Sequence, residues 1–126
     1  MVTIKKIFVV DDDAMFAEML REFLARNVGY SVLVYNTGED CVAAISQNPD
    51  VIILDYYLNS VSINAADGMK ILEQIKKQKP NVHVIMLSSQ ESYGTALKTI
   101  TKGAEQYVIK GKEAFDEIAN IISQMD

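Results

Sequence analysis

Four apolar runs in this chain each end at polar residues whose side chains can do chemistry. Carboxyl ends of parallel strands are where ligands and reactive groups gather in an open α/β sheet. If these runs are parallel strands, carboxylates, hydroxyls and an ammonium group converge on one edge, a set that can take up a phosphoryl group on a carboxylate. The residues are Asp11, Asp12 and Asp13 after 8–10, Asp55 after 51–54, Ser88 and Ser89 after 84–87, and Lys110 after 107–109.

The aspartates at the predicted sheet edge point to a divalent cation. Asp11, Asp12 and Asp55 would come from neighbouring strand ends. Two like charges about 4 Å apart repel by about 4 kcal/mol at an effective dielectric of 20. Such a cluster needs a cation or a raised pKa. Hard carboxylate oxygens suit Mg²⁺, which keeps several waters and bridges readily to phosphate, with Mn²⁺ as an alternative ion.

Asp55 is the predicted nucleophile of this group. Phosphoryl transfer depends mostly on positioning and on neutralising charge. The cation would neutralise from one side and Lys110 from the other, while the Ser88 hydroxyl hydrogen-bonds a phosphoryl oxygen. Each residue taken singly has a plain structural explanation, such as Asp13 capping a helix, and only their joint occurrence at four strand ends favours function.

Strand-like and helix-like segments alternate five times along the chain. This alternation predicts a doubly wound α/β fold, a parallel sheet with right-handed crossovers and helices on both faces. The first helix is expected to bury Met15, Phe16, Met19, Leu20, Phe23 and Leu24, and the last Phe115, Ile118, Ala119, Ile122 and Met125. The expected strands are 4–10, 30–35, 51–54, 83–87 and 106–109. The expected helices are 14–26, one capped by Thr37 and ended by Asn48-Pro49-Asp50, 67–78, 92–101 and 113–125.

Composition limits the classes of function. A chain of 126 residues, 49% of them hydrophobic, predicts one domain over 1–126. The net charge of −5 argues against direct binding of nucleic acid by this domain. No apolar stretch approaches the roughly 20 residues of a membrane helix. Cys41 is the single cysteine, so a reducing, cytoplasmic location is expected.

On these residues the chain resembles the receiver domain of two-component response regulators over essentially its whole length. The resemblance implies a (βα)5 flavodoxin-like three-layer sandwich, with a five-stranded parallel sheet in the order 2-1-3-4-5. The matching segments are residues 9–13, 53–55, Asp67-Gly68, 86–89, Gly103-Ala104 and 107–110.

The resemblance also implies a metal site and a phosphoryl donor. Asp55 would be phosphorylated by a sensor histidine kinase or a histidine phosphotransfer protein. Asp12 and Asp55 would bind Mg²⁺ directly, Asp11 would help through water, and the backbone carbonyl of Tyr57 would be a further ligand.

Two further roles follow from the same resemblance. Ser88 and Lys110 would contact the phosphoryl group, and Tyr107 would be the switch aromatic residue, turning inward when Ser88 is drawn toward the phosphate. The protein would then be a signalling switch, not a turnover enzyme. The phosphorylated protein would bind a downstream effector or act on an output domain. A phosphorylation-linked homodimer is a further alternative.

The chain departs from the family pattern in two loops. Asp67 and Gly68 lie 12 and 13 residues after Asp55, farther than in the family, and Leu58-Asn59 replaces Met-Pro. We expect the resulting insertion, residues 60–66, to form a flap or a partner contact. Gly111 stands where the family has proline, so we predict a trans bond from Lys110 and a looser loop.

Two positions and three alternatives stay open at the level of sequence. Tyr57 could hinder a hydrolytic water and Gln90 could orient one, so the acyl-phosphate lifetime is undecided. An aspartyl-nucleophile phosphatase is disfavoured because Tyr57 stands where a second aspartate is expected. A flavodoxin-like cofactor binder lacks a phosphate loop after the first strand. A phosphate-independent interaction module is the remaining alternative.

Overall fold

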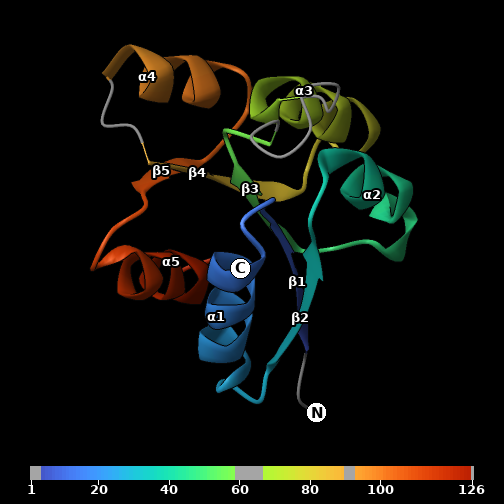
Figure 1. The fold of residues 1–126 in the computed structure, drawn as a ribbon. Coiled ribbons are helices and arrows are strands. Elements are labelled where there is room, and N and C mark those ends of the chain that lie inside the picture. The colour runs from blue at the N-terminus through green and yellow to red at the C-terminus, as the bar shows by residue number, and fades with distance from the viewer. Residues whose placement is uncertain (1–3, 59–66, 90–92, 126) are drawn as a thin grey trace.

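Five parallel strands form one sheet at the centre of the molecule (Figure 1). The computed structural model describes residues 4–58, 67–89 and 93–125. The sheet order is β2-β1-β3-β4-β5, which confirms the predicted order. The strands are β1 (Lys5–Val10), β2 (Tyr30–Tyr35), β3 (Val51–Asp55), β4 (His83–Ser88) and β5 (Gln106–Ile109).

Helices cover both faces of the sheet and complete the three layers. One face carries α1 (Ala14–Ala25) and α5 (Ala114–Ser123). The other carries α2 (Gly38–Ala43), α3 (Gly68–Gln78) and α4 (Tyr93–Thr101), as Figure 1 shows. A single 3-10 turn, η1 (Ile45–Gln47), follows α2. The flavodoxin-like doubly wound fold expected from the sequence is therefore confirmed.

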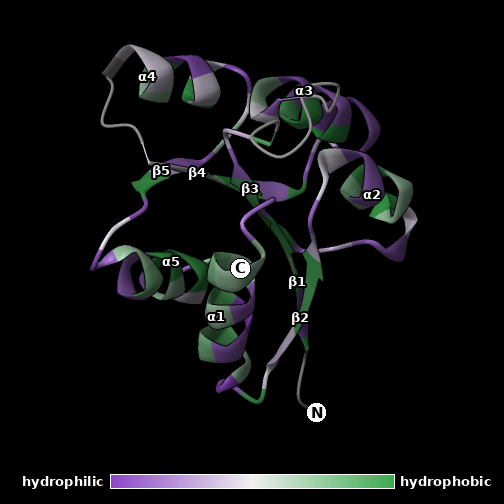
Figure 2. Ribbon diagram, viewed as in Figure 1, coloured by the Kyte–Doolittle hydropathy of each residue, from purple (hydrophilic) through white to green (hydrophobic). Residues whose placement is uncertain are grey.

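Alternating side chains of the inner strands build two cores. Ile7 and Val9 of β1 pack on the α1 and α5 side, whereas Phe8 and Val10 pack toward α2 and α3. Every residue of β3 is buried, as expected for a strand covered on both faces. Figure 2 shows the apolar colour along the inner strands and polar residues on the outer side of α3. The central strands are thus anchored on both faces, which fixes where they end.

Polar caps start three of the helices at defined residues. The side chains of Asp13, Thr37 and Asp67 accept hydrogen bonds from backbone N–H groups three residues on. Each cap satisfies a donor that the first helical turn leaves unpaired. The predicted caps at Asp13 and Thr37 are confirmed.

The exposed face of α1 corrects one expectation. Met15 is 74% exposed and Met19 54% exposed, although both were expected to face inward. The buried residues of this helix are Ala17, Leu20 and Leu24, so the stripe that contacts the sheet is narrower than the apolar pattern. Packing against one flat sheet covers only part of a helix circumference, and the two methionines lie outside that part.

Smaller differences concern element ends and loops. The second helix stops at Ala43 and tightens into η1, and Asn48 adopts a left-handed conformation with φ 58°. No cis peptide bond occurs in the described residues, so the predicted trans bond between Lys110 and Gly111 is confirmed. Residues 60–66 and Gln90 lie outside the described residues, and the expectations for them stay predictions.

Candidate functional site

Backbone hydrogen bonds hold the carboxyl ends of the strands level with one another. In each bond, the N–H of the first residue beyond one strand donates to the carbonyl of the last or penultimate residue of a neighbouring strand. The chain direction leaving each strand is therefore fixed by the sheet itself. The bonds are Asp11 N to Tyr35 O at 3.0 Å, Tyr56 N to Leu87 O at 2.8 Å and Lys110 N to Ser88 O at 2.8 Å.

Three carboxylates converge at this edge. One oxygen from each of Asp11, Asp12 and Asp55 lies within 4.8 Å of the others. Asp11 has no exposed surface, Asp55 is 3% exposed and Asp12 is half-buried. The structure thus brings together the three aspartates that the sequence places after β1 and at the end of β3.

Lys110 supplies the positive charge at the same place. Its Nζ lies 2.9 Å from Asp11 Oδ2 and 3.6 Å from Asp55 Oδ2. The side chain is only 18% exposed, so water screens these ion pairs less than it would at the surface. The ammonium group bridges the two most deeply buried carboxylates of the cluster.

Burial and neighbouring charge shift the titration of both partners. Desolvation and the negative charge of Asp11 raise the pKa of Asp55 to about 8, against the opposing effect of Lys110. For Lys110, desolvation opposes the charged form, but the hydrogen bond and charges of the aspartates outweigh it and raise the pKa of the ammonium. The single positive charge of Lys110 therefore does not offset the negative charge of the carboxylates in this cluster.

The remaining carboxylate oxygens have specific backbone contacts. Asp11 Oδ1 accepts from Asp13 N at 3.0 Å, and Asp55 Oδ1 accepts from Tyr57 N at 3.4 Å. Asp11 Oδ2 is buried and forms the ion pair with the Lys110 ammonium. Each side chain is thus oriented by the turn that follows its own strand.

This donor set fits a hard divalent cation. Three carboxylates with one oxygen each within 4.8 Å of the others match the all-oxygen surroundings that Mg²⁺ or Mn²⁺ takes. Asp12 is half-buried, so solvent reaches this side of the cluster, in keeping with the waters that Mg²⁺ retains. Burial and the negative charge of Asp11 raise the pKa of Asp55, and a cation would offset that negative charge.

Ser88 lies at the carboxyl end of β4, and Tyr107 lies within the neighbouring strand β5. Ser88 closes β4 and is fully buried, next to the backbone of Lys110. Tyr107 is half-buried in β5, in register with Met86, and packs on the core under α3. Their placement agrees with the sequence prediction, while their roles stay predictions.

Gly68 brings α3 against the end of β3. Its N–H donates to Tyr56 O at 2.9 Å. A Cβ atom here would lie 2.7 Å from Tyr56 Cα and closer still to the carbonyl oxygen of Asp55. Only glycine allows this approach. The start of α3 therefore packs directly against the backbone of Asp55 and Tyr56.

Sequence reasoning missed two residues that touch the site. Asn36 Nδ2 donates to the carbonyl oxygen of Asp11 at 3.0 Å. Asn36 follows β2 directly, so the strand-end pattern contained a signal for it. Phe16, assigned only to the core, places its ring 4.7 Å from Lys110 Nζ, and the sequence carries no signal for that contact.

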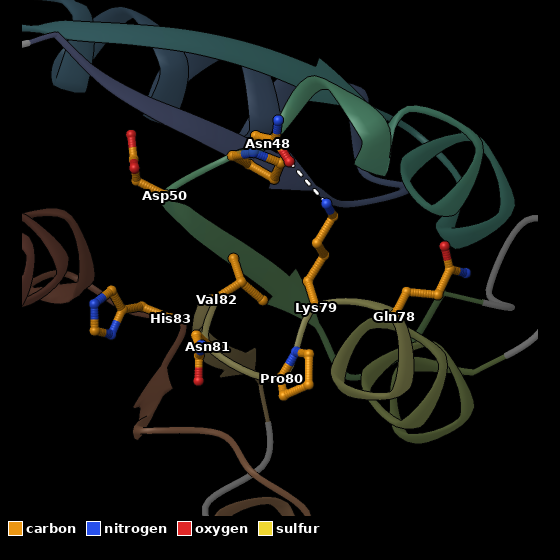
Figure 3. A pocket seen from close by; sticks show the side chains of 9 residues that line it. Asn48, Asp50, Gln78, Lys79, Pro80, Asn81, Val82 and His83 are labelled. Atoms are coloured by element: carbon orange, nitrogen blue, oxygen red, sulfur yellow. Dashed lines mark hydrogen bonds between the residues drawn. The ribbon is translucent and has the colours of Figure 1, made fainter.

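A separate hollow of about 340 Å³ lies at the opposite edge of the sheet. Figure 3 shows its side chains, with Lys79 reaching toward Asn48 across a 2.8 Å hydrogen bond. It borders the amino ends of β3 and β4 and includes none of the acidic cluster. The residues that line it are Asn48, Pro49, Asp50, Gln78, Lys79, Pro80, Asn81, Val82 and His83.

A parallel sheet in this order, with aspartates and a lysine at its carboxyl edge, defines a class of α/β signalling domain. Residues 7–123 match the family model of the response regulator receiver domain. The chain belongs to this family, the receiver domains of two-component systems.

Named relatives and solved structures agree with the family. The chain is 32% identical over 107 residues to the "Probable C4-dicarboxylate response regulator DctR" of Bacillus subtilis, covering 83% of this chain and 45% of that protein. It is 31% identical over 107 residues to the B. subtilis alkaline phosphatase synthesis transcriptional regulatory protein PhoP, covering 84% and 42%. The BeF3-activated DrrB receiver domain superposes with a TM-score of 0.84 at 27% identity over 97% of each chain.

The chain spans less than half the length of the curated relatives it matches. Among the described residues, no helix combines the length and apolar character needed to cross a bilayer.

Proposed function

We propose that residues 1–126 form one receiver domain in which Asp55 accepts a phosphoryl group. The donor is the phosphohistidine of a sensor histidine kinase or of a histidine phosphotransfer protein. The observation that carries the proposal is the meeting of three aspartates within 4.8 Å, with Lys110 Nζ 3.6 Å from Asp55 Oδ2. Because receiver domains act as switches, one round of transfer, not turnover of a substrate, is the expected chemistry.

The transfer moves one phosphoryl group between two side chains. A carboxylate oxygen of Asp55 forms the new bond to phosphorus as the bond from phosphorus to the donor imidazole nitrogen breaks. The electron pair stays on that nitrogen, which takes up a proton. Asp55 must be ionised for this step, so the raised pKa of the carboxyl in the metal-free state disfavours it.

Charge at the transferred group would be neutralised from two directions. Asp11, Asp12, Asp55 and the backbone carbonyl of Tyr57 would hold Mg²⁺ or Mn²⁺, which supplies Lewis-acid charge neutralisation when bound. Lys110 approaches from the side of Asp11 and Asp55. Its ammonium would pair with a phosphoryl oxygen as charge develops there.

The phosphorylated state would be read through Ser88 and Tyr107. A phosphoryl group adds about −1.5 to −2 charges next to the buried end of β4. The Ser88 hydroxyl would donate to a phosphoryl oxygen, and Tyr107 would move into the space this opens. A shift of a few kcal/mol between two arrangements of α4, β5 and α5 is enough to change partner binding. The reader would be an effector protein, a linked output domain or a second copy.

Intact mass spectrometry tests the proposal. Protein incubated with acetyl phosphate and Mg²⁺ is expected to gain the mass of one phosphoryl group. Asp55→Ala should gain none, and Asp116→Ala, an exposed aspartate on α5, should behave as wild type. An unmodified wild-type protein, or an equal gain in Asp55→Ala, would rule the proposal out.

A further inference from the structure

The ammonium group of Lys110 contacts an aromatic ring as well as two carboxylates. Lys110 Nζ lies over the ring of Phe16 at 4.7 Å from its centroid. A cation within about 6 Å of a ring face is attracted by the negative charge above that face, and the attraction grows when water is excluded. Lys110 is largely buried, so this contact belongs to the stronger kind.

The Phe16 ring is itself held in place by two helices. Its backbone N–H donates to Asp13 Oδ1 at 3.1 Å in the first turn of α1. Its ring meets Phe115 of α5 edge-on, with centroids 5.5 Å apart and planes at 69°. The ring centroid of Phe115 in turn lies 5.4 Å from that of Phe23, which follows Phe16 on α1 about two helical turns later. Three rings thus form a row between α1 and α5 that ends at the ammonium.

We propose that Phe16 is a positioning residue, whose ring holds the Lys110 ammonium between Asp11 and Asp55. The proposal extends the proposed function, because it assigns a determinant of the phosphorylation rate at the same site. A lysine side chain has four flexible carbon atoms and loses much freedom when its charge is fixed. A ring that already restricts the ammonium lowers the cost of placing it at the phosphoryl group.

The same contact links the site to the packing of α1 against α5. A partner that shifts α1 relative to α5 would move the Phe16 ring, because Phe115 contacts it from α5. The ring would then release or tighten its hold on Lys110. The aromatic row therefore couples the placement of Lys110 to the packing of α1 against α5.

Matched leucine variants separate the ring contact from general packing. Phe16→Leu keeps an apolar side chain but removes the ring beside Lys110. Phe23→Leu removes a ring from the same row without touching Lys110 and serves as the control. With acetyl phosphate and Mg²⁺, Phe16→Leu should be phosphorylated about five-fold more slowly, equivalent to about 1 kcal/mol. Phe23→Leu should stay within two-fold of wild type, and Phe16→Tyr should recover most of the rate.

Nuclear magnetic resonance gives a readout that does not depend on phosphorylation. The Lys110 Hε protons of the wild type should be shifted upfield by the Phe16 ring current. The shift should vanish in Phe16→Leu and persist in Phe23→Leu. Unshifted Lys110 protons in the wild type, or equal slowing in Phe16→Leu and Phe23→Leu, would overturn the inference. A wild type that takes no phosphoryl group would instead count against the proposed function, while the proton shifts still decide the positioning.

Discussion

Replacing the acceptor aspartate by asparagine should stabilise the metal-free protein at neutral and alkaline pH. Asp55→Asn keeps the shape of the side chain but cannot ionise. The raised pKa of Asp55 means that the folded protein favours its protonated form. In the wild type, the Asp55 carboxyl therefore makes its full contribution to the free energy of unfolding below about pH 4. This contribution is lost as the pH rises toward 8. Asp55→Asn cannot ionise at this position, so its free energy of unfolding does not fall for this reason as the pH rises.

The size of the effect follows from the distances at the site. The carboxylate oxygens lie within 4.8 Å of one another, so at an effective dielectric of 20 each repulsion of Asp55 by Asp11 and by Asp12 is at least about 3.5 kcal/mol. At 3.6 Å, the attraction of Lys110 is about 4.6 kcal/mol. The ionised Asp55 thus costs about 2 kcal/mol before desolvation is added. For a domain of this size, the melting temperature should rise by about 6–8 °C.

Thermal unfolding followed by circular dichroism in EDTA measures this difference. Wild type, Asp55→Asn and the control Asp116→Asn are melted between pH 5 and pH 8.5. Asp116 is exposed on α5, so its variant should stay within about 0.5 kcal/mol of wild type at each pH. The advantage of Asp55→Asn should be small at pH 5 and largest at pH 8.5. A pH-independent difference, or a less stable Asp55→Asn at pH 8.5, would refute the electrostatic reasoning.

Three further predictions concern the cation, the α3 approach and the lysine. Mg²⁺ should stabilise wild type by about 2.7 kcal/mol at one hundred times its Kd, as measured by melting, and an equal effect on Asp12→Asn would contradict the metal site. Gly68→Ala should destabilise by about 2–4 kcal/mol in urea, because its Cβ meets the end of β3. The control Gly94→Ala in α4, where the Cβ position is open space, should leave the free energy of unfolding unchanged or raise it by up to about 1 kcal/mol. Equal destabilisation by Gly68→Ala and Gly94→Ala would contradict the close approach of α3 to β3. Lys110→Met should slow phosphorylation at least ten-fold, and an unchanged rate would exclude Lys110 from charge neutralisation.

The strands and most of the core were predictable because the inner strands are apolar on both faces. The runs that became β3 and β4 can be buried only at the centre of a sheet, and their order followed from the family resemblance. The faces of α1 were less predictable. Its apolar pattern includes Met15 and Met19, but the width of the contact depends on how the helix lies on the sheet, which periodicity does not contain.

The membership of the site was predictable from residue types at strand ends, whereas its contacts were not. Asp11, Asp12 and Asp55 converge as expected. The closer approach of Lys110 to Asp11 than to Asp55 depends on the path of the loop after β5. The ring of Phe16 reaches the ammonium only because α1 packs against α5, a tertiary contact between distant segments.

Reductive trapping of the acyl phosphate tests the central claim most directly. Protein treated with acetyl phosphate and Mg²⁺ is reduced with borohydride, which converts an aspartyl phosphate to homoserine, and its peptides are sequenced by tandem mass spectrometry. We predict homoserine at position 55 alone. Homoserine at position 11 or 12, or none anywhere in a protein that has gained phosphoryl mass, would contradict Asp55 as the acceptor.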